Sequence, residues 1–171
     1  MIKKHQQVFV VTGAGGGIGR ALCEKIIKEG HYVFALDIRI SSLQAIEENI
    51  DAAEKMRYGY AALDVTDEKA FADVLDSAQQ KFGRIDCLIN NAGVMSSGAF
   101  LDTSMAVWRK VIDINLMGVV YGTKTAVDIM RQQGFGKIVN VASTAGVTPV
   151  LNATAYAASK FAMTGLAESI R

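Results

Sequence analysis

Two residues near the end of the sequence have the types and the spacing needed for proton transfer: Tyr156 and Lys160, in the run Tyr156-Ala157-Ala158-Ser159-Lys160. Side chains four residues apart lie on the same face of a helix, so the Lys160 ammonium would stand beside the phenol. A free phenol has a pKa of about 10 and is a poor base at neutral pH, whereas an adjacent cation stabilises the phenolate. The pair therefore predicts acid–base chemistry on a substrate oxygen.

A serine thirteen residues before Tyr156 strengthens this prediction. Ser143 follows an apolar, strand-like run at Lys137–Ala142. Open α/β sheets bind ligands beyond the carboxyl ends of their strands, so we expect Ser143 in that crevice. Taken alone, Ser143 would more simply cap the end of its strand. Together with Tyr156 and Lys160 it predicts a catalytic set.

A glycine-rich segment follows the first strand-like run and precedes a helix: Thr12-Gly13-Ala14-Gly15-Gly16-Gly17-Ile18-Gly19-Arg20. Such a turn lets the backbone approach a pyrophosphate, and the helix N-terminus supplies unpaired N–H groups. The spacing is Gly-x-x-x-Gly-x-Gly, which differs both from Gly-x-Gly-x-x-Gly and from the P-loop of nucleotide hydrolases. It predicts dinucleotide binding at Gly13, Gly17, Ile18 and Gly19 rather than a plain tight turn.

An acidic residue ends the second strand-like run, eighteen residues after Gly19. The carboxylate of Asp37 can accept hydrogen bonds from the adenosine ribose hydroxyls and would repel a 2′-phosphate, which favours NAD over NADP. Arg39 could soften that repulsion. The other interpretation makes Asp37 a helix cap; it is weaker because Ser41 or Ser42 can serve as the cap.

Strand-like and helix-like segments alternate along the chain. This alternation predicts an α/β fold with a doubly wound, Rossmann-type parallel sheet, in the strand order 3-2-1-4-5 and without the later strands. The expected strands are Val8–Thr12, Tyr32–Asp37, Tyr58–Leu63, Cys87–Asn90 and Lys137–Ala142. The expected helices are Ile18–Glu29, Ser41–Ala53, Asp67–Phe82, Ser104–Gln132 and Ala153–Arg171, with Gly30, Gly83 and Gly134 as stop signals.

Composition excludes several classes of protein. The chain has 171 residues with a net charge of +1, which argues against a basic surface for nucleic acid. Cys23 and Cys87 form no Cys-x-x-Cys pair, so we expect two buried thiols in a reducing compartment, with no zinc site. The apolar run Val8–Val11 near Met1 and Lys4 is shorter than a signal peptide or membrane span requires. We therefore expect one cytoplasmic domain over residues 1–171.

Taken in order, these motifs resemble those of the short-chain dehydrogenase/reductase family. The residues that carry the resemblance are Thr12-Gly13-x-x-x-Gly17-x-Gly19, Asp64-Val65, Asn90-Asn91-Ala92-Gly93, Asn115, Ser143 and Tyr156-x-x-x-Lys160. The resemblance implies that Tyr156 is the general acid/base and that Lys160 lowers the Tyr156 pKa and binds the nicotinamide ribose. It also implies that Ser143 orients the substrate oxygen and that Asn115 holds a water linking Lys160 to solvent.

The same resemblance assigns the remaining motif residues to the cofactor. Asp64 and Val65 would contact the adenine, Asn90 would lie against the adenosine ribose, and Asn91, Ala92 and Gly93 would shape the floor of the site. NAD is the implied cofactor and no metal is required. The simpler interpretations are that Asn115 is a satisfied core polar group in a bent helix and that Asn90 and Asn91 form a turn.

Members of this family usually continue well past the point that corresponds to Arg171. We therefore expect a domain that is incomplete at its C-terminal end, with the strand at Lys137–Ala142 left at an edge, and an isolated chain with little turnover.

The predicted function is hydride transfer between NAD(H) and a secondary alcohol or ketone. The alternatives are an NADPH-dependent ketone reductase and a dinucleotide-binding sensor without chemistry. The loops at Val94–Phe100 and Thr144–Ala155 contain no Arg or Lys, which favours a weakly polar or apolar substrate over a strongly anionic one. Apolar helix faces predict a homodimer or homotetramer, without nucleic-acid or membrane partners.

Overall fold

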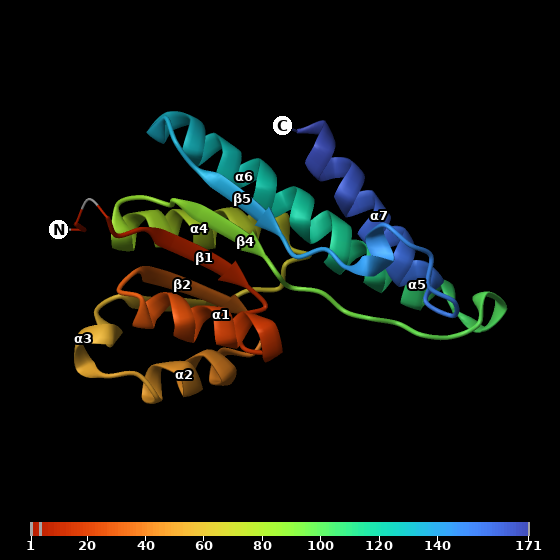
Figure 1. Cartoon of the computed structure of the whole chain (residues 1–171), viewed down its shortest axis with the longest axis horizontal. Coiled ribbons are helices and arrows are strands. Elements are labelled where there is room, and N and C mark those ends of the chain that lie inside the picture. The colour runs from red at the N-terminus through yellow and green to blue at the C-terminus, as the bar shows by residue number, and fades with distance from the viewer. Residues whose placement is uncertain (1, 4, 171) are drawn as a thin grey trace.

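Five parallel strands form one sheet in the computed structural model, which describes residues 2, 3 and 5–170 (Figure 1). The strands stand in the order β3-β2-β1-β4-β5, which confirms the predicted order. Their bounds are β1 (Val8–Thr12), β2 (Tyr32–Asp37), β3 (Tyr58–Ala62), β4 (Cys87–Asn90) and β5 (Lys137–Asn140). Residues 1 and 4, and the predicted helix end at residue 171, lie outside the described residues.

Helices cover both faces of the sheet, as the alternating pattern predicts. On one face α1 (Gly17–Lys28) and α2 (Ile40–Glu48) enclose a core that includes Val11, Cys23 and Ile89. On the other face α4 (Glu68–Phe82) and α6 (Gly118–Gln133) enclose a second core around Val10, Phe71 and Leu88. Alternate strand residues thus face opposite cores, which fixes the register of each strand.

The register brings the carboxyl ends of the strands to one edge of the sheet. Asp37 of β2 lies opposite Ala62 of β3, and Asn90 of β4 lies opposite Asn140 of β5. The segments that follow these strands are the ones in which the sequence places the candidate site. The fold therefore gathers motifs far apart in the chain at a single edge.

The predicted helix Ser41–Ala53 is wrong in its bounds, because two helices occupy the region. The first, α2, ends at Glu48, and α3 (Ala52–Lys55) starts anew from a capping box. In that box the Asp51 carboxylate accepts from the Glu54 N–H at 2.7 Å, and the Glu54 carboxylate accepts from the Asp51 N–H at 3.0 Å. The expected serine cap is also wrong: α2 begins at Ile40, and its N-cap residue Arg39 makes no side-chain capping bond.

The long predicted helix Ser104–Gln132 is interrupted by a wider turn. It consists of α5 (Met105–Ile112), the π-helical turn η2 (Asp113–Met117) and α6, which is followed by its C-cap Gly134. Single π-turns inside α-helices accommodate an extra residue and are frequent at functional sites. Here the turn carries Asn115, which is fully buried.

Two loops extend to the same side of the molecule, one between β4 and α5 and the other between β5 and α7 (Thr154–Ser169) (Figure 1). They contain the short 3-10 helices η1 (Phe100–Asp102) and η3 (Thr144–Gly146). The Gly98 N–H donates to the Asn152 carbonyl at 2.7 Å, which joins the two loops just before α7 begins. Within the described ranges, no helix combines the length and apolar character needed to cross a bilayer.

Candidate active site

The glycine-rich turn between β1 and α1 leaves its backbone accessible. Gly13 has a φ of +64°, and a Cβ there would lie 2.8 Å from the Cα of Ala92, so the position requires glycine. A Cβ on Gly19 would lie 2.2 Å from the Gly13 carbonyl oxygen. Gly16 caps α1 without a side-chain hydrogen bond, and Ile18 is 64% exposed. The first N–H groups of α1 are therefore open to an anion.

Thr12 and Asn91 tie this turn to the end of β4. The Thr12 hydroxyl oxygen accepts from the N–H groups of Asn91 and Ala92, each at 3.0 Å. The Asn91 amide donates to the carbonyls of Thr12 and Gly13 at 2.9 and 3.1 Å. Thr12 therefore has a structural role at the site that was not predicted; a threonine at the end of a strand, directly before the first glycine of the turn, is the sequence signal for it.

A cavity of about 170 Å³ lies beside the turn, at the carboxyl ends of β2 and β3. Its lining combines apolar side chains with the carboxylates of Asp37 and Asp64, so the residues present fit the adenosine half of the predicted dinucleotide. Asp64 and Val65, predicted to contact adenine, both line it, although one Asp64 oxygen is engaged by Thr66. Its lining comprises Gly13, Asp37, Ile38, Leu63, Asp64, Val65, Ala92, Gly93, Val94 and Ile114.

Asn90 differs from its neighbours in the motif because it is buried, with 3% exposure. Its amide nitrogen donates to the Asn140 side-chain oxygen at 2.9 Å and to the Thr123 hydroxyl at 3.3 Å. These bonds tie β4 to β5 and α6. The contact with the adenosine ribose stays a prediction.

Lys160 and Tyr156 lie on the same side of α7, as their spacing predicts. The Lys160 ammonium nitrogen is 5.7 Å from the centroid of the Tyr156 ring and donates to the Val141 carbonyl at 2.7 Å. Lys160 is 5% exposed, and this burial lowers its pKa. The bond to Val141, directly after β5, holds the face of α7 that carries Tyr156 and Lys160 to the end of the sheet. A main-chain carbonyl partner of this kind cannot be recognised from residue identity.

Ser143 lies between β5 and α7, half-buried. Its hydroxyl oxygen accepts from the Ala145 N–H at 3.1 Å and caps the short helix η3. Ser143 therefore caps the helix that follows rather than the end of its strand, and its catalytic role stays a prediction. Because the hydroxyl is the acceptor in that bond, its own hydrogen could be donated to another group.

Asn115 bonds to two other elements through its side chain. Its amide oxygen accepts from the Val94 N–H at 2.8 Å, and its nitrogen donates to the Val94 carbonyl at 2.9 Å and to the Ser159 hydroxyl at 3.1 Å. The amide is thus a satisfied core polar group that anchors the loop after β4. The water that the family resemblance assigns to Asn115 stays a prediction.

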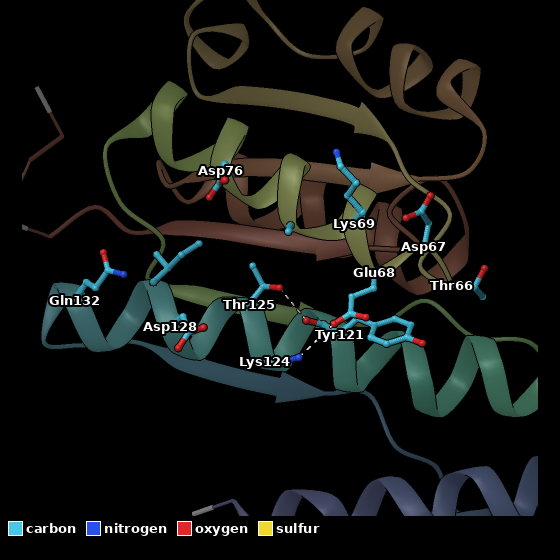
Figure 2. A pocket seen from close by; sticks show the side chains of 12 residues that line it. Thr66, Asp67, Glu68, Lys69, Asp76, Tyr121, Lys124, Thr125, Asp128 and Gln132 are labelled. Atoms are coloured by element: carbon cyan, nitrogen blue, oxygen red, sulfur yellow. Dashed lines mark hydrogen bonds and ion pairs between the residues drawn. The ribbon is translucent and has the colours of Figure 1, made fainter.

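A wide groove of about 980 Å³ lies away from this edge, between α4 and α6 (Figure 2). Lys124 reaches across it to Glu68, with 3.3 Å between the ammonium nitrogen and the carboxylate oxygen. The residues predicted for catalysis or cofactor binding are not among those that line it. The candidate site at the strand ends and this larger groove are therefore separate features of the surface.

Comparison with known proteins agrees with this geometry. The family model for short chain dehydrogenases matches residues 7–171, and the chain therefore belongs to that family. It is 36% identical to a 2-dehydro-3-deoxy-L-rhamnonate dehydrogenase (NAD(+)) from a Sphingomonas species, over 94% of this chain and 63% of the relative.

Two solved structures are also similar. A short chain dehydrogenase/reductase from Burkholderia phymatum in complex with NAD has a TM-score of 0.92 at 32% identity, covering 99% of this chain and 60% of the other. An NAD+-bound xylitol dehydrogenase has a TM-score of 0.90 at 35% identity, covering 98% and 65%. The chain thus spans 60–65% of the length of these relatives.

Proposed function

We propose that the chain carries the cofactor-binding and proton-transfer site of an NAD-dependent oxidoreductase that interconverts a secondary alcohol and a ketone. The observation that carries the proposal is the buried Lys160 ammonium beside Tyr156, held at the same sheet edge as the glycine-rich turn. A buried cation next to a phenol in a ligand crevice is an arrangement suited to acid–base chemistry.

The residues around the cavity would hold the cofactor. The open N-terminus of α1 would bind the pyrophosphate, with Gly13, Gly17, Ile18 and Gly19 forming the cradle. Asp37 would bind the adenosine ribose, Asp64 and Val65 the adenine, and Asn91, Ala92 and Gly93 would form the floor. When bound, NAD supplies the hydride acceptor at nicotinamide C4, which no side chain can provide.

The residues on α7 and at the end of β5 would manage the proton. Tyr156, as a phenolate stabilised by the adjacent Lys160 ammonium, would accept the hydroxyl proton of the alcohol and become a neutral phenol as hydride leaves the substrate carbon. Ser143 would donate a hydrogen bond to the substrate oxygen as its charge changes. Asn115 would hold the water that connects Lys160 to solvent.

NAD is proposed over NADP because the Asp37 carboxylate faces the turn, where a 2′-phosphate would meet like charge. Arg39 could reduce this preference, since its guanidinium nitrogen lies 4.0 Å from the carboxylate. Relatives bound to NAD or named for NAD(+) support the same cofactor.

We propose a weakly polar alcohol or ketone as the substrate. Met95, Val147 and Leu151 of the two loops are 69%, 68% and 94% exposed and give this side an apolar surface.

Oligomerisation is proposed from the apolar faces of the helices α5, α6 and α7, where Met105, Val127 and Phe161 are 63%, 40% and 42% exposed. Sedimentation that shows only a monomer would contradict the oligomer.

The test combines binding with turnover. Calorimetry should show that the chain binds NAD+, and NADH formation should be followed by absorbance with a panel of secondary alcohols. Tyr156→Phe should lose at least about a hundredfold in turnover while NAD+ affinity stays within about twofold. Tyr121→Phe, in the groove of Figure 2, is the matched control and should keep both.

The possible results separate the proposal from its alternatives. Absence of NAD+ binding, or full turnover by Tyr156→Phe, would overturn the proposal. NAD+ binding without NADH formation from any alcohol, measured at high protein concentration because little turnover is expected of this chain, would instead support a dinucleotide-binding sensor. A preference for NADPH would support the ketone reductase.

A further inference from the structure

Ser159, between the two catalytic positions of α7, makes contacts that the proposed chemistry does not use. Its side chain has no exposed surface. The hydroxyl donates to the Tyr156 carbonyl at 2.7 Å and accepts from the Asn115 amide nitrogen at 3.1 Å. One hydroxyl thus connects the backbone at the proposed acid/base to the π-turn.

Asn115 extends this connection to a third element. Both of its amide hydrogens are used, one by the Val94 carbonyl and one by Ser159. Val94 belongs to the loop after β4 and lines the cavity beside the glycine-rich turn. A continuous chain of hydrogen bonds therefore runs from the cavity wall at Val94 to the helix turn that carries Tyr156.

Local helix stability does not account for a serine here. A serine hydroxyl that bonds to a carbonyl of the preceding turn stabilises a helix little or not at all, and alanine has the better helix propensity. The contribution specific to Ser159 is the hydrogen bond that it accepts from Asn115. Without that bond, a fully buried N–H of Asn115 would be left unpaired, which is unfavourable.

We propose that Ser159 is a positioning residue, which acts through Asn115 to hold the loop at Val94 in register with the face of α7 that carries Tyr156 and Lys160. The inference rests on the proposed function, because the register it sets is that between the proposed cofactor cavity, which Val94 lines, and the phenol of Tyr156. Misplacement of reacting groups by about 1 Å can cost about a hundredfold in rate.

The test compares Ser159→Ala with Ser169→Ala on the same helix. Ser169 also donates to a carbonyl one turn earlier, at 2.8 Å, but it is exposed and makes no contact with Asn115. Calorimetry measures the affinities for NAD+ and for its nicotinamide-free fragment ADP-ribose, and steady-state kinetics measures kcat.

In Ser159→Ala we expect a roughly tenfold lower kcat, while the affinities for NAD+ and ADP-ribose change by less than about twofold, because the two bonds between Asn115 and Val94 at the cavity wall remain. Ser169→Ala should match the unmodified chain in kcat and in its affinities for NAD+ and ADP-ribose. Asn115→Ala combined with Ser159→Ala should lose no more than Asn115→Ala alone, because the two residues act in series.

Two results would overturn the proposal. In the first, Ser159→Ala would keep its kcat and its NAD+ affinity. In the second, it would lose NAD+ and ADP-ribose affinity equally, which would indicate a general loss of structure. Failure of the proposed function is distinguishable, because it would be seen in the unmodified chain as an absence of NAD+ binding.

Discussion

The carboxylate of Asp37 accepts a hydrogen bond from the main-chain N–H of Gly15, with 2.9 Å between Oδ2 and the nitrogen. Its other oxygen accepts from the Arg39 N–H at 3.0 Å. The residue proposed to bind the adenosine ribose therefore also fixes the glycine-rich turn. Each carboxylate oxygen can accept two hydrogen bonds, so both roles are compatible. A substitution that tests cofactor choice must keep an acceptor for Gly15.

Asp37→Asn meets this condition, since it keeps an acceptor oxygen while removing the charge. We expect NADH affinity to fall by about tenfold, because a charge-assisted hydrogen bond to the ribose is replaced by a neutral one. NADPH affinity should rise, because the repulsion of the 2′-phosphate is removed. Calorimetry with both cofactors measures the change, and Arg39→Gln serves as the control that reports the contribution of the guanidinium. An unchanged ratio of the two affinities in Asp37→Asn would contradict the role of this carboxylate.

Gly19 is a second position where a substitution should weaken NAD+ binding, here by the addition of a single Cβ atom. Its Cβ would lie 2.2 Å from the Gly13 carbonyl oxygen, so Gly19→Ala must displace the turn. Overpacking of this kind costs about 1–3 kcal/mol, and we expect NAD+ affinity to fall by tenfold to about a hundredfold. The control is Gly165→Ala on α7, where a Cβ meets nothing within 4 Å. That variant should bind NAD+ normally and gain about 0.5–1 kcal/mol in urea unfolding. Equal NAD+ affinity in the two variants would refute the close-approach argument.

The sheet could be predicted from the sequence because buried parallel strands read as short apolar runs that end in Gly, Asp or Asn. The runs Val8–Thr12, Tyr32–Asp37 and Cys87–Asn90 match the observed strands residue for residue. The positions of Asp37 and Gly13 at one edge followed from the strand order alone. Such regularities depend on burial and connection rules rather than on individual contacts.

The features that escaped prediction depend on long-range or competing hydrogen bonds. The capping box at Asp51 competes with continuation of α2. The π-turn exists where Asn115 bonds to Val94 and Ser159, which are distant in sequence. The Lys160 partner is a main-chain carbonyl, which residue identity does not reveal. Each of these requires knowledge of which elements pack together.

Lys160 should make stability depend on pH. Burial lowers its folded-state pKa below the unfolded value of about 10.4. Below the folded pKa the ammonium is charged in both states, and its desolvation opposes folding in full. As the pH rises between the two pKa values, the unfolded state binds more protons, so stability rises. Lys160→Met should therefore be more stable than the unmodified chain at neutral pH, and the difference should shrink as the pH approaches about 10.4.

Urea unfolding at a series of pH values measures this difference, with the exposed Lys110→Met as the control that should show no such trend. A lower stability of Lys160→Met at neutral pH would mean that the bond to the Val141 carbonyl outweighs the cost of desolvation.

Asn152 should be sensitive to backbone conformation, because it has a φ of 57° and its carbonyl accepts the Gly98 N–H that joins the two loops. A left-handed conformation costs an ordinary L-residue about 1–2 kcal/mol, whereas glycine adopts it freely and asparagine tolerates it. Asn152→Ala should therefore lose about 1 kcal/mol in urea unfolding, while Asn152→Gly stays close to the unmodified chain. Both variants remove the same side-chain amide, so a difference between them isolates the backbone. If alanine and glycine gave the same stability, the left-handed turn before α7 would contribute nothing to holding the two loops together.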